Sequence, residues 1–172
     1  MIGVLLFCDE GKRGCTPLLT TLRAIDDIYV LYWNHPNLLE TIKKSNVDRW
    51  VLSGNATYTK DTDMYRVPMG IFSMPIRVFA ICYSFQSTLV QLGYTMHHKP
   101  RQAITKYIQY KGKKILVALN YTQCIKSPVK GEEAASAGES MIVRYKNSLM
   151  TQFHPEKTAD GRALLYEFLQ KN

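Results

Sequence analysis

The sequence is poor in cysteine and has no long apolar run, and each of these absences excludes a class of protein. Its 172 residues contain four cysteines, none of which forms a CxxC pair or has a histidine at metal-ligand spacing beside it. A disulfide framework and a metal site are therefore not predicted. Thiols stay reduced in the cytoplasm, so we expect a cytoplasmic location. The cysteines are Cys8, Cys15, Cys82 and Cys124.

A membrane span, a leader peptide and a nucleotide-binding motif are missing as well. No stretch approaches the roughly 18 apolar residues that a membrane-spanning helix needs. The opening MIGVLLFC lacks a basic leader and a small-residue cleavage site, and no P-loop is present. We expect a soluble, unprocessed single domain over residues 1–172, with no cofactor and no membrane contact.

Acidic residues are absent from the segment 99–130, which holds eight lysines and arginines. This number equals the formal net charge of +8, so the basic excess is concentrated there. Lysines on an edge strand keep a hairpin soluble and block edge-to-edge pairing. The alternatives are docking to an acidic partner surface or to nucleic acid, because tyrosines alternate with lysines in the segment. The residues concerned are Lys106, Tyr107, Tyr110, Lys111, Lys113 and Lys114.

Short apolar runs alternate with amphipathic ones in the first half of the chain, which predicts an α/β fold. The runs are apolar at almost every position, as is typical of parallel strands that helices cover on both faces. We expect a mostly parallel central sheet with helices on both faces. The predicted central strands are residues 2–7, 28–32, 50–52 and 76–81.

The second half predicts antiparallel additions at one edge of the sheet. Residues 106–120 indicate two strands joined at Lys111-Gly112-Lys113, and residues 140–153 indicate a second hairpin. The stretch EEAASAGES (132–140) between them resembles a linker. Residues 158–170 close the chain as an amphipathic helix whose apolar stripe is Leu164, Leu165, Phe168 and Leu169.

One cysteine, in the run FAICYSFQ (79–86), lies where a buried strand turns into a helix. Apolar residues follow it at helical spacing, at Phe85, Leu89 and Leu92, and Gly93 is a natural helix terminator. The N–H groups at a helix start favour an anion and can receive a developing oxyanion. Cys82 is therefore a candidate nucleophile, although a buried structural thiol is the alternative.

A base for this nucleophile is available among the four histidines. His154 follows the apolar run LMTQF, and Pro155 prevents that strand from continuing. Glu156 is two residues further on, so in extended geometry it shares a face with His154 and can orient the imidazole. Nucleophile, base and orienting carboxylate are then Cys82, His154 and Glu156.

These motifs resemble the class I glutamine amidotransferases. AICYSFQ resembles the family's G-x-C-x-G-x-Q elbow, QFHPE its H-P-E motif, VLSGNA (51–56) its S-G-G-P oxyanion loop, and LNYTQCIKSP (119–128) a further S-H-G-D segment. Cys82 followed by Tyr83 is most similar to the subfamily of GMP synthase amidotransferase domains. The resemblance implies a flavodoxin-like three-layer sandwich with antiparallel edge strands.

The resemblance also implies roles for individual residues. Cys82 would attack the side-chain amide of glutamine, His154 would give a proton to the departing ammonia, and Glu156 would hold His154. An ammonia-accepting synthetase chain is the implied partner. The oxyanion hole would use the backbone N–H groups of Asn55 and Tyr83, and the glutamine pocket would be lined by Gly54, Gln86, Asn120, Tyr121 and Thr122.

Several glycines of the family pattern are replaced, which leaves other functions open. Ala80 and Ser84 flank the elbow, Asn55 and Thr122 replace two further glycines, and Ala56 replaces a proline. A less preorganised oxyanion hole costs turnover. The alternatives are an inactive fold that binds a partner through the basic segment, and a hydrolase of another γ-glutamyl compound.

Overall fold

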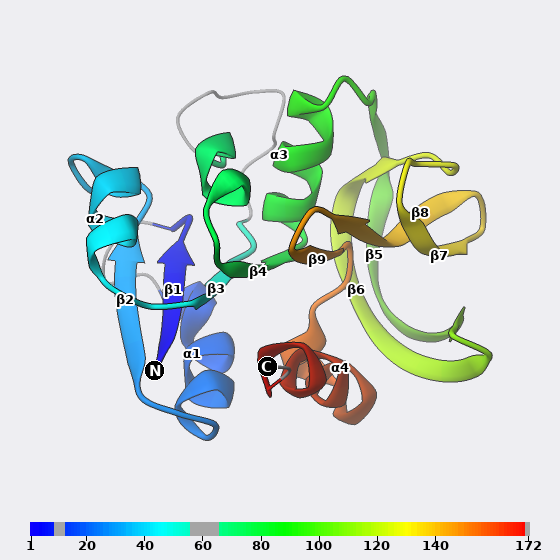
Figure 1. Cartoon of the computed structure of the whole chain (residues 1–172). Coiled ribbons are helices and arrows are strands. Elements are labelled where there is room, and N and C mark those ends of the chain that lie inside the picture. The colour runs from blue at the N-terminus through cyan, green and yellow to red at the C-terminus, as the bar shows by residue number, and fades with distance from the viewer. Residues whose placement is uncertain (9–12, 56–65, 171–172) are drawn as a thin grey trace.

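The computed structural model describes residues 1–8, 13–55 and 66–170 and is built on a seven-stranded sheet of order β2-β1-β3-β4-β9-β8-β7 (Figure 1). The first five strands in this order are parallel, and β8 and β7 are added antiparallel at one edge. The predicted mostly parallel sheet with antiparallel edge strands is confirmed. The strands are β1 (Ile2–Leu6), β2 (Ile28–Tyr32), β3 (Arg49–Leu52), β4 (Arg77–Ile81), β7 (Glu132–Ser136), β8 (Glu139–Tyr145) and β9 (Ser148–Thr151).

Two hydrophobic cores lie on opposite faces of this sheet. Side chains alternate along each strand, so Ile2, Val4 and Leu6 of β1 enter one core while Leu5 enters the other. The first core is covered by α1 (Thr16–Arg23) and α4 (Ala159–Gln170), the second by α2 (Leu38–Lys44) and α3 (Tyr83–Gln91). Figure 1 shows these two helix pairs on opposite sides of the strands, which is the expected three-layer arrangement.

The first four strands lie within a residue of their predicted limits, but one of them has a different place in the sheet. The run 28–32 was predicted to be central, and β2 instead forms the edge, where most of its side chains are only half-buried. An apolar run at an edge looks the same in sequence as one in the interior.

Gly3 of β1, the strand next to β2, is required by packing, because a β-carbon there would overlap the indole of Trp50.

The predicted hairpin at 106–120 is confirmed and is longer than expected, but its expected place at the edge of the central sheet is wrong. β5 (Met96–Tyr110) and β6 (Lys113–Ile125) form a separate two-stranded antiparallel sheet. They join through Lys111 and Gly112, both with positive φ, at 48° and 74°. Such a turn matches the twist of the flanking strands.

The second predicted hairpin is also confirmed, but the linker is wrong. β8 and β9 pair around Tyr145 and Ser148, and β9 also pairs in parallel with β4, so it lies inside the sheet rather than at its edge. The segment 132–140 is not a linker, because it forms β7 and the turn into β8. Its alanines and serines carry little strand signal of their own.

The remaining helical elements follow the sequence pattern closely. The predicted stripe of α4 is buried, and α3 ends just before Gly93, whose φ is 97°. Leu92, which was expected on the buried stripe of α3, is 38% exposed. No helix in the described part of the chain is long and apolar enough to cross a membrane. Three short 3₁₀ turns complete the described part of the chain: η1 (Arg13–Cys15), η2 (Met69–Ser73) and η3 (Pro155–Lys157).

Candidate active site

Cys82 lies at the turn between β4 and α3, in a backbone conformation that few residues adopt. Its φ is 50° and its ψ is −97°, which places a non-glycine residue in a strained region. The turn is fixed from both sides, because the Cys82 N–H donates to the Thr151 carbonyl (2.7 Å) and its carbonyl accepts from Gln86 N–H (2.9 Å). Strain at a sharp strand-to-helix turn is typical of a nucleophile held at the end of a sheet.

The sheet order brings the base to this nucleophile. β4 and β9 are parallel neighbours, with Ile81 opposite Thr151, so the residues that follow them emerge at the same edge. His154 stands three residues after β9, and its N–H donates to the carbonyl of Ala118 (2.9 Å). Gly54, just beyond β3, completes the group: a β-carbon there would lie 3.1 Å from His154 Cε1 and 3.5 Å from Cys82 Cβ.

His154 and Glu156 form a buried pair. Nδ1 of His154 lies 2.9 Å from Oε1 of Glu156, and the two side chains are 16% and 7% exposed. Burial by itself lowers the pKa of His154, but the Cys82 thiolate, followed by Glu156, outweighs it and raises this pKa to about 10. At neutral pH a pKa of about 10 keeps His154 protonated, and an imidazolium beside Cys82 is an acid that can protonate a leaving group.

The segment Ser53–Asn55 is anchored to both neighbouring elements. Ser53 Oγ accepts the Phe7 N–H (3.0 Å), and the Asn55 side-chain amide donates to the Phe7 carbonyl. Ser84 Oγ, on the first turn of α3, donates to the Ser53 carbonyl. Ser84 thus ties the turn at Cys82 to the predicted oxyanion segment. Ala56 lies outside the described residues.

Gln86 is turned into the protein, where it reaches Cys82 through a second glutamine. Gln86 Nε2 donates to the Gln123 carbonyl (2.7 Å) and to Gln152 Oε1 (3.2 Å). Gln152 Nε2 in turn lies 3.7 Å from Cys82 Sγ. Sequence reasoning missed Gln152, which is fully buried. Its position two residues before His154, in QFHPE, was the available signal.

The predicted pocket residues on β6 divide into two groups. The Asn120 carbonyl lies 3.9 Å from Cys82 Sγ, and Thr122 is half-buried on the same strand. The Tyr121 hydroxyl, in contrast, donates to Glu139 Oε2 (2.6 Å), and Glu139 also pairs with Lys99. Burial, followed by Glu139, raises the pKa of Tyr121, so its hydroxyl stays protonated.

Tyr83, whose N–H is the other predicted oxyanion donor, is the first residue of α3.

The two tyrosines that are interleaved with lysines in the basic segment differ in exposure. Tyr107 is 64% exposed, but Tyr110 is 7% exposed and its hydroxyl donates to Glu133 (2.9 Å). Tyr110 is therefore not available for base stacking, and the nucleic-acid alternative rests on Tyr107 and the lysines. Lys99, at the start of the segment, is neutralised by Glu139.

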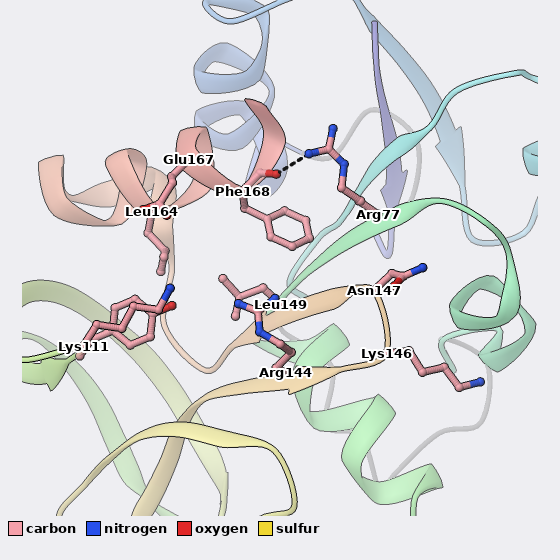
Figure 2. Close-up of a pocket in the computed structure, with 10 residues that line it drawn as sticks. Arg77, Lys111, Arg144, Lys146, Asn147, Leu149, Leu164, Glu167 and Phe168 are labelled. Atoms are coloured by element: carbon pink, nitrogen blue, oxygen red, sulfur yellow. Dashed lines mark hydrogen bonds between the residues drawn. The ribbon is translucent and has the colours of Figure 1, made fainter. Parts of the chain in front are cut away.

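A cavity of about 240 Å³, shown in Figure 2, is lined by Arg77 and other residues, and it lies at the opposite end of β4 from Cys82. Arg77 begins β4, whereas Cys82 follows its end. The arginines of the cavity already have partners, since Arg77 donates to the Phe168 carbonyl (3.1 Å) and Arg144 pairs with Glu133 (2.6 Å). None of the predicted site residues lines this cavity. Its lining is Arg77, Tyr110, Lys111, Arg144, Lys146, Asn147, Leu149, Leu164, Glu167 and Phe168.

Comparison with known proteins supports the fold. No family model matches the chain. The structure of a candidate GMP synthase subunit from Thermoplasma acidophilum matches with a TM-score of 0.76 and 18% identity, over 98% of this chain and 92% of the other. A glutamine amidotransferase from Thermotoga maritima matches with a TM-score of 0.66 and 12% identity, over 96% and 81%. In sequence, 89 residues are 28% identical to the glutamine-hydrolysing GMP synthase of Tolumonas auensis, which is 52% of this chain and 17% of that protein.

Proposed function

We propose that this chain, which has the fold of the class I glutamine amidotransferases, hydrolyses the side-chain amide of glutamine and supplies the ammonia to a synthetase. The observation that carries the proposal is the juxtaposition of Cys82, on its strained turn, with the buried His154–Glu156 pair. A φ of 50° at a cysteine is a strained conformation that is typical of functional sites, and Cys82 is the group that contributes most to raising the pKa of His154.

In the proposed reaction the Cys82 thiolate attacks the amide carbon of glutamine and forms a tetrahedral intermediate. The N–H groups of Tyr83 and Asn55 receive the oxyanion. The His154 imidazolium gives its proton to the departing nitrogen, so ammonia leaves and a γ-glutamyl thioester remains. His154, now neutral, takes a proton from water, which attacks the thioester and releases glutamate. Glu156 keeps the imidazole oriented through both steps.

The glutamine pocket in this proposal lies between two segments that meet at Cys82. Gly54 leaves room because it has no side chain beside His154, and Asn120 and Thr122 approach from β6. Gln86 supports the pocket from inside the protein and does not face the substrate, because its amide is already bound to Gln123 and Gln152. Tyr121 forms part of the wall through its ring, since its hydroxyl is bound to Glu139.

The synthetase partner belongs to the proposal as well. The GMP synthase of Tolumonas auensis is described as glutamine-hydrolysing, and the matched segment is 17% of that protein. A protein that supplies ammonia to a synthesis depends on a second active site that consumes it. We therefore propose that the acceptor site lies on a separate synthetase chain or domain.

Ammonia release from glutamine tests the activity directly. We expect release by the purified protein, loss of release in Cys82→Ala, and a γ-glutamyl adduct on Cys82 by mass spectrometry. Cys124→Ala is the matched control, because Cys124 is also a buried thiol. The proposal would be overturned if the folded protein released no ammonia and formed no adduct, even after a synthetase fraction was added. Hydrolysis of a γ-glutamyl anilide but not of glutamine would support the other γ-glutamyl substrate class.

A further inference from the structure

Cys8 and Cys15 have their sulfur atoms 3.0 Å apart, although the sequence pattern gave no sign of a pair. Cys8 follows β1, and Cys15 immediately precedes α1. A strand end and a helix start are brought together here by the packing of α1 on the sheet. A disulfide needs a sulfur separation of about 2.0 Å, so the two side chains need to move by about 1 Å.

We propose that Cys8 and Cys15 are a modification site that forms a reversible disulfide with a small-molecule disulfide such as oxidised glutathione as the oxidant. Cys8 is half-buried and Cys15 is 9% exposed, so the oxidant meets Cys8 first. The Cys8 thiolate attacks one sulfur of oxidised glutathione and expels one glutathione thiolate. The Cys15 thiolate then attacks the Cys8 sulfur of this mixed disulfide and expels the second. Two protein thiols are oxidised and one glutathione disulfide is reduced.

The pair is connected to the candidate active site through the residue before Cys8. Phe7 donates its N–H to Ser53 Oγ (3.0 Å), and its carbonyl accepts from the Asn55 side chain. Both ends of the predicted oxyanion segment are therefore held by Phe7, and Gly54 between them lies beside His154. A bond that draws Cys8 toward Cys15 displaces these contacts. The disulfide is then expected to lower amide hydrolysis, a consequence that rests on the proposed function.

The disulfide itself is tested without any activity measurement. The Cys82→Ala protein is incubated with oxidised glutathione or with dithiothreitol, and its thiols are counted after denaturation. Its three thiols should fall to one, with the intact mass lower by two hydrogen atoms. Trypsin cleaves after Lys12 and Arg13, so peptides containing Cys8 and Cys15 should be linked through their sulfurs.

Single variants distinguish this mechanism from random oxidation. Cys15→Ser should stop at a glutathione adduct on Cys8, Cys8→Ser should form no internal disulfide, and Cys124→Ser should still form it. Three persistent thiols, or a disulfide that includes Cys124, would overturn the proposal.

The connection to the site is tested in the protein that retains Cys82. Oxidation should lower ammonia release about tenfold or more, and dithiothreitol should restore it. Cys8→Ser should not respond in this way. An unchanged rate in fully oxidised protein would overturn the connection, whereas an inactive reduced protein would overturn the proposed function and leave the disulfide to be decided by mass.

Discussion

The backbone N–H of Cys82 donates to the carbonyl of Thr151 at 2.7 Å, and this bond joins the candidate nucleophile to the strand that leads to its base. It continues the parallel pairing of β4 with β9, in which Ile81 lies opposite Thr151. The strand register therefore brings Cys82 and His154 to the same edge of the sheet, and the bond from the His154 N–H to the Ala118 carbonyl holds the segment that follows β9. Sites built on rigid elements hold their geometry better than sites built on loops alone.

The pairing of His154 predicts a pH dependence of stability. The folded pKa of about 10 lies above the ordinary value of 6.5. Charged His154 therefore stabilises the fold fully below pH 6.5, and this contribution is lost as the pH rises through about 10. The difference in free energy of unfolding between the unmodified protein and His154→Gln should shrink over this range. Urea denaturation at a series of pH values measures it.

The cause of the raised pKa can be checked separately by NMR titration of the His154 imidazole. The Cys82 thiolate is the largest of the groups that raise the pKa of His154. Cys82→Ala should therefore lower it, while Cys124→Ala should leave it unchanged. A pKa that does not move in Cys82→Ala would show that the two residues do not interact.

Gly54→Ala is expected to reduce ammonia release by about tenfold to a hundredfold, because the new methyl group would displace His154 from its position beside Cys82. Its β-carbon would lie 3.1 Å from His154 Cε1, so the imidazole has to move by a few tenths of an ångström. Gly14→Ala is the matched control, since nothing lies within 4 Å of a β-carbon there. Steady-state kinetics on both variants, with circular dichroism to show that they fold, measure the effect. Equal rates for the two would contradict the placement of Gly54 over the site.

Much of the fold could be predicted from sequence because period and composition act locally. The run before Cys82 and the helical spacing after it gave both β4 and the start of α3. The stripe on α4 was predicted for the same reason. The order of strands is not local, so the edge position of β2 and the interior position of β9 could not be read from their apolar runs.

The candidate site, too, could be predicted only where the signal is local in the sequence. Cys82, His154 and Glu156 carry functional side chains at motif spacing, so they could be named from sequence. The contacts of Gln152 with Cys82 and of Cys8 with Cys15 depend on how distant elements pack. The inward turn of the Tyr121 hydroxyl likewise depends on Glu139, the first residue of β8, which the sequence placed in a linker.

Tyr121→Phe separates two roles for this tyrosine. Because its hydroxyl is bound to Glu139 at 2.6 Å, we expect the variant to lose about 1.5 to 3 kcal/mol of stability while KM for glutamine changes less than about threefold. Tyr110→Phe is the matched control, since Tyr110 makes the same kind of bond to Glu133 (2.9 Å) at the far end of the strands. Urea denaturation and steady-state kinetics on both variants provide the measurements. A large rise in KM in Tyr121→Phe alone, with stability unchanged, would mean that the hydroxyl leaves Glu139 to bind the substrate.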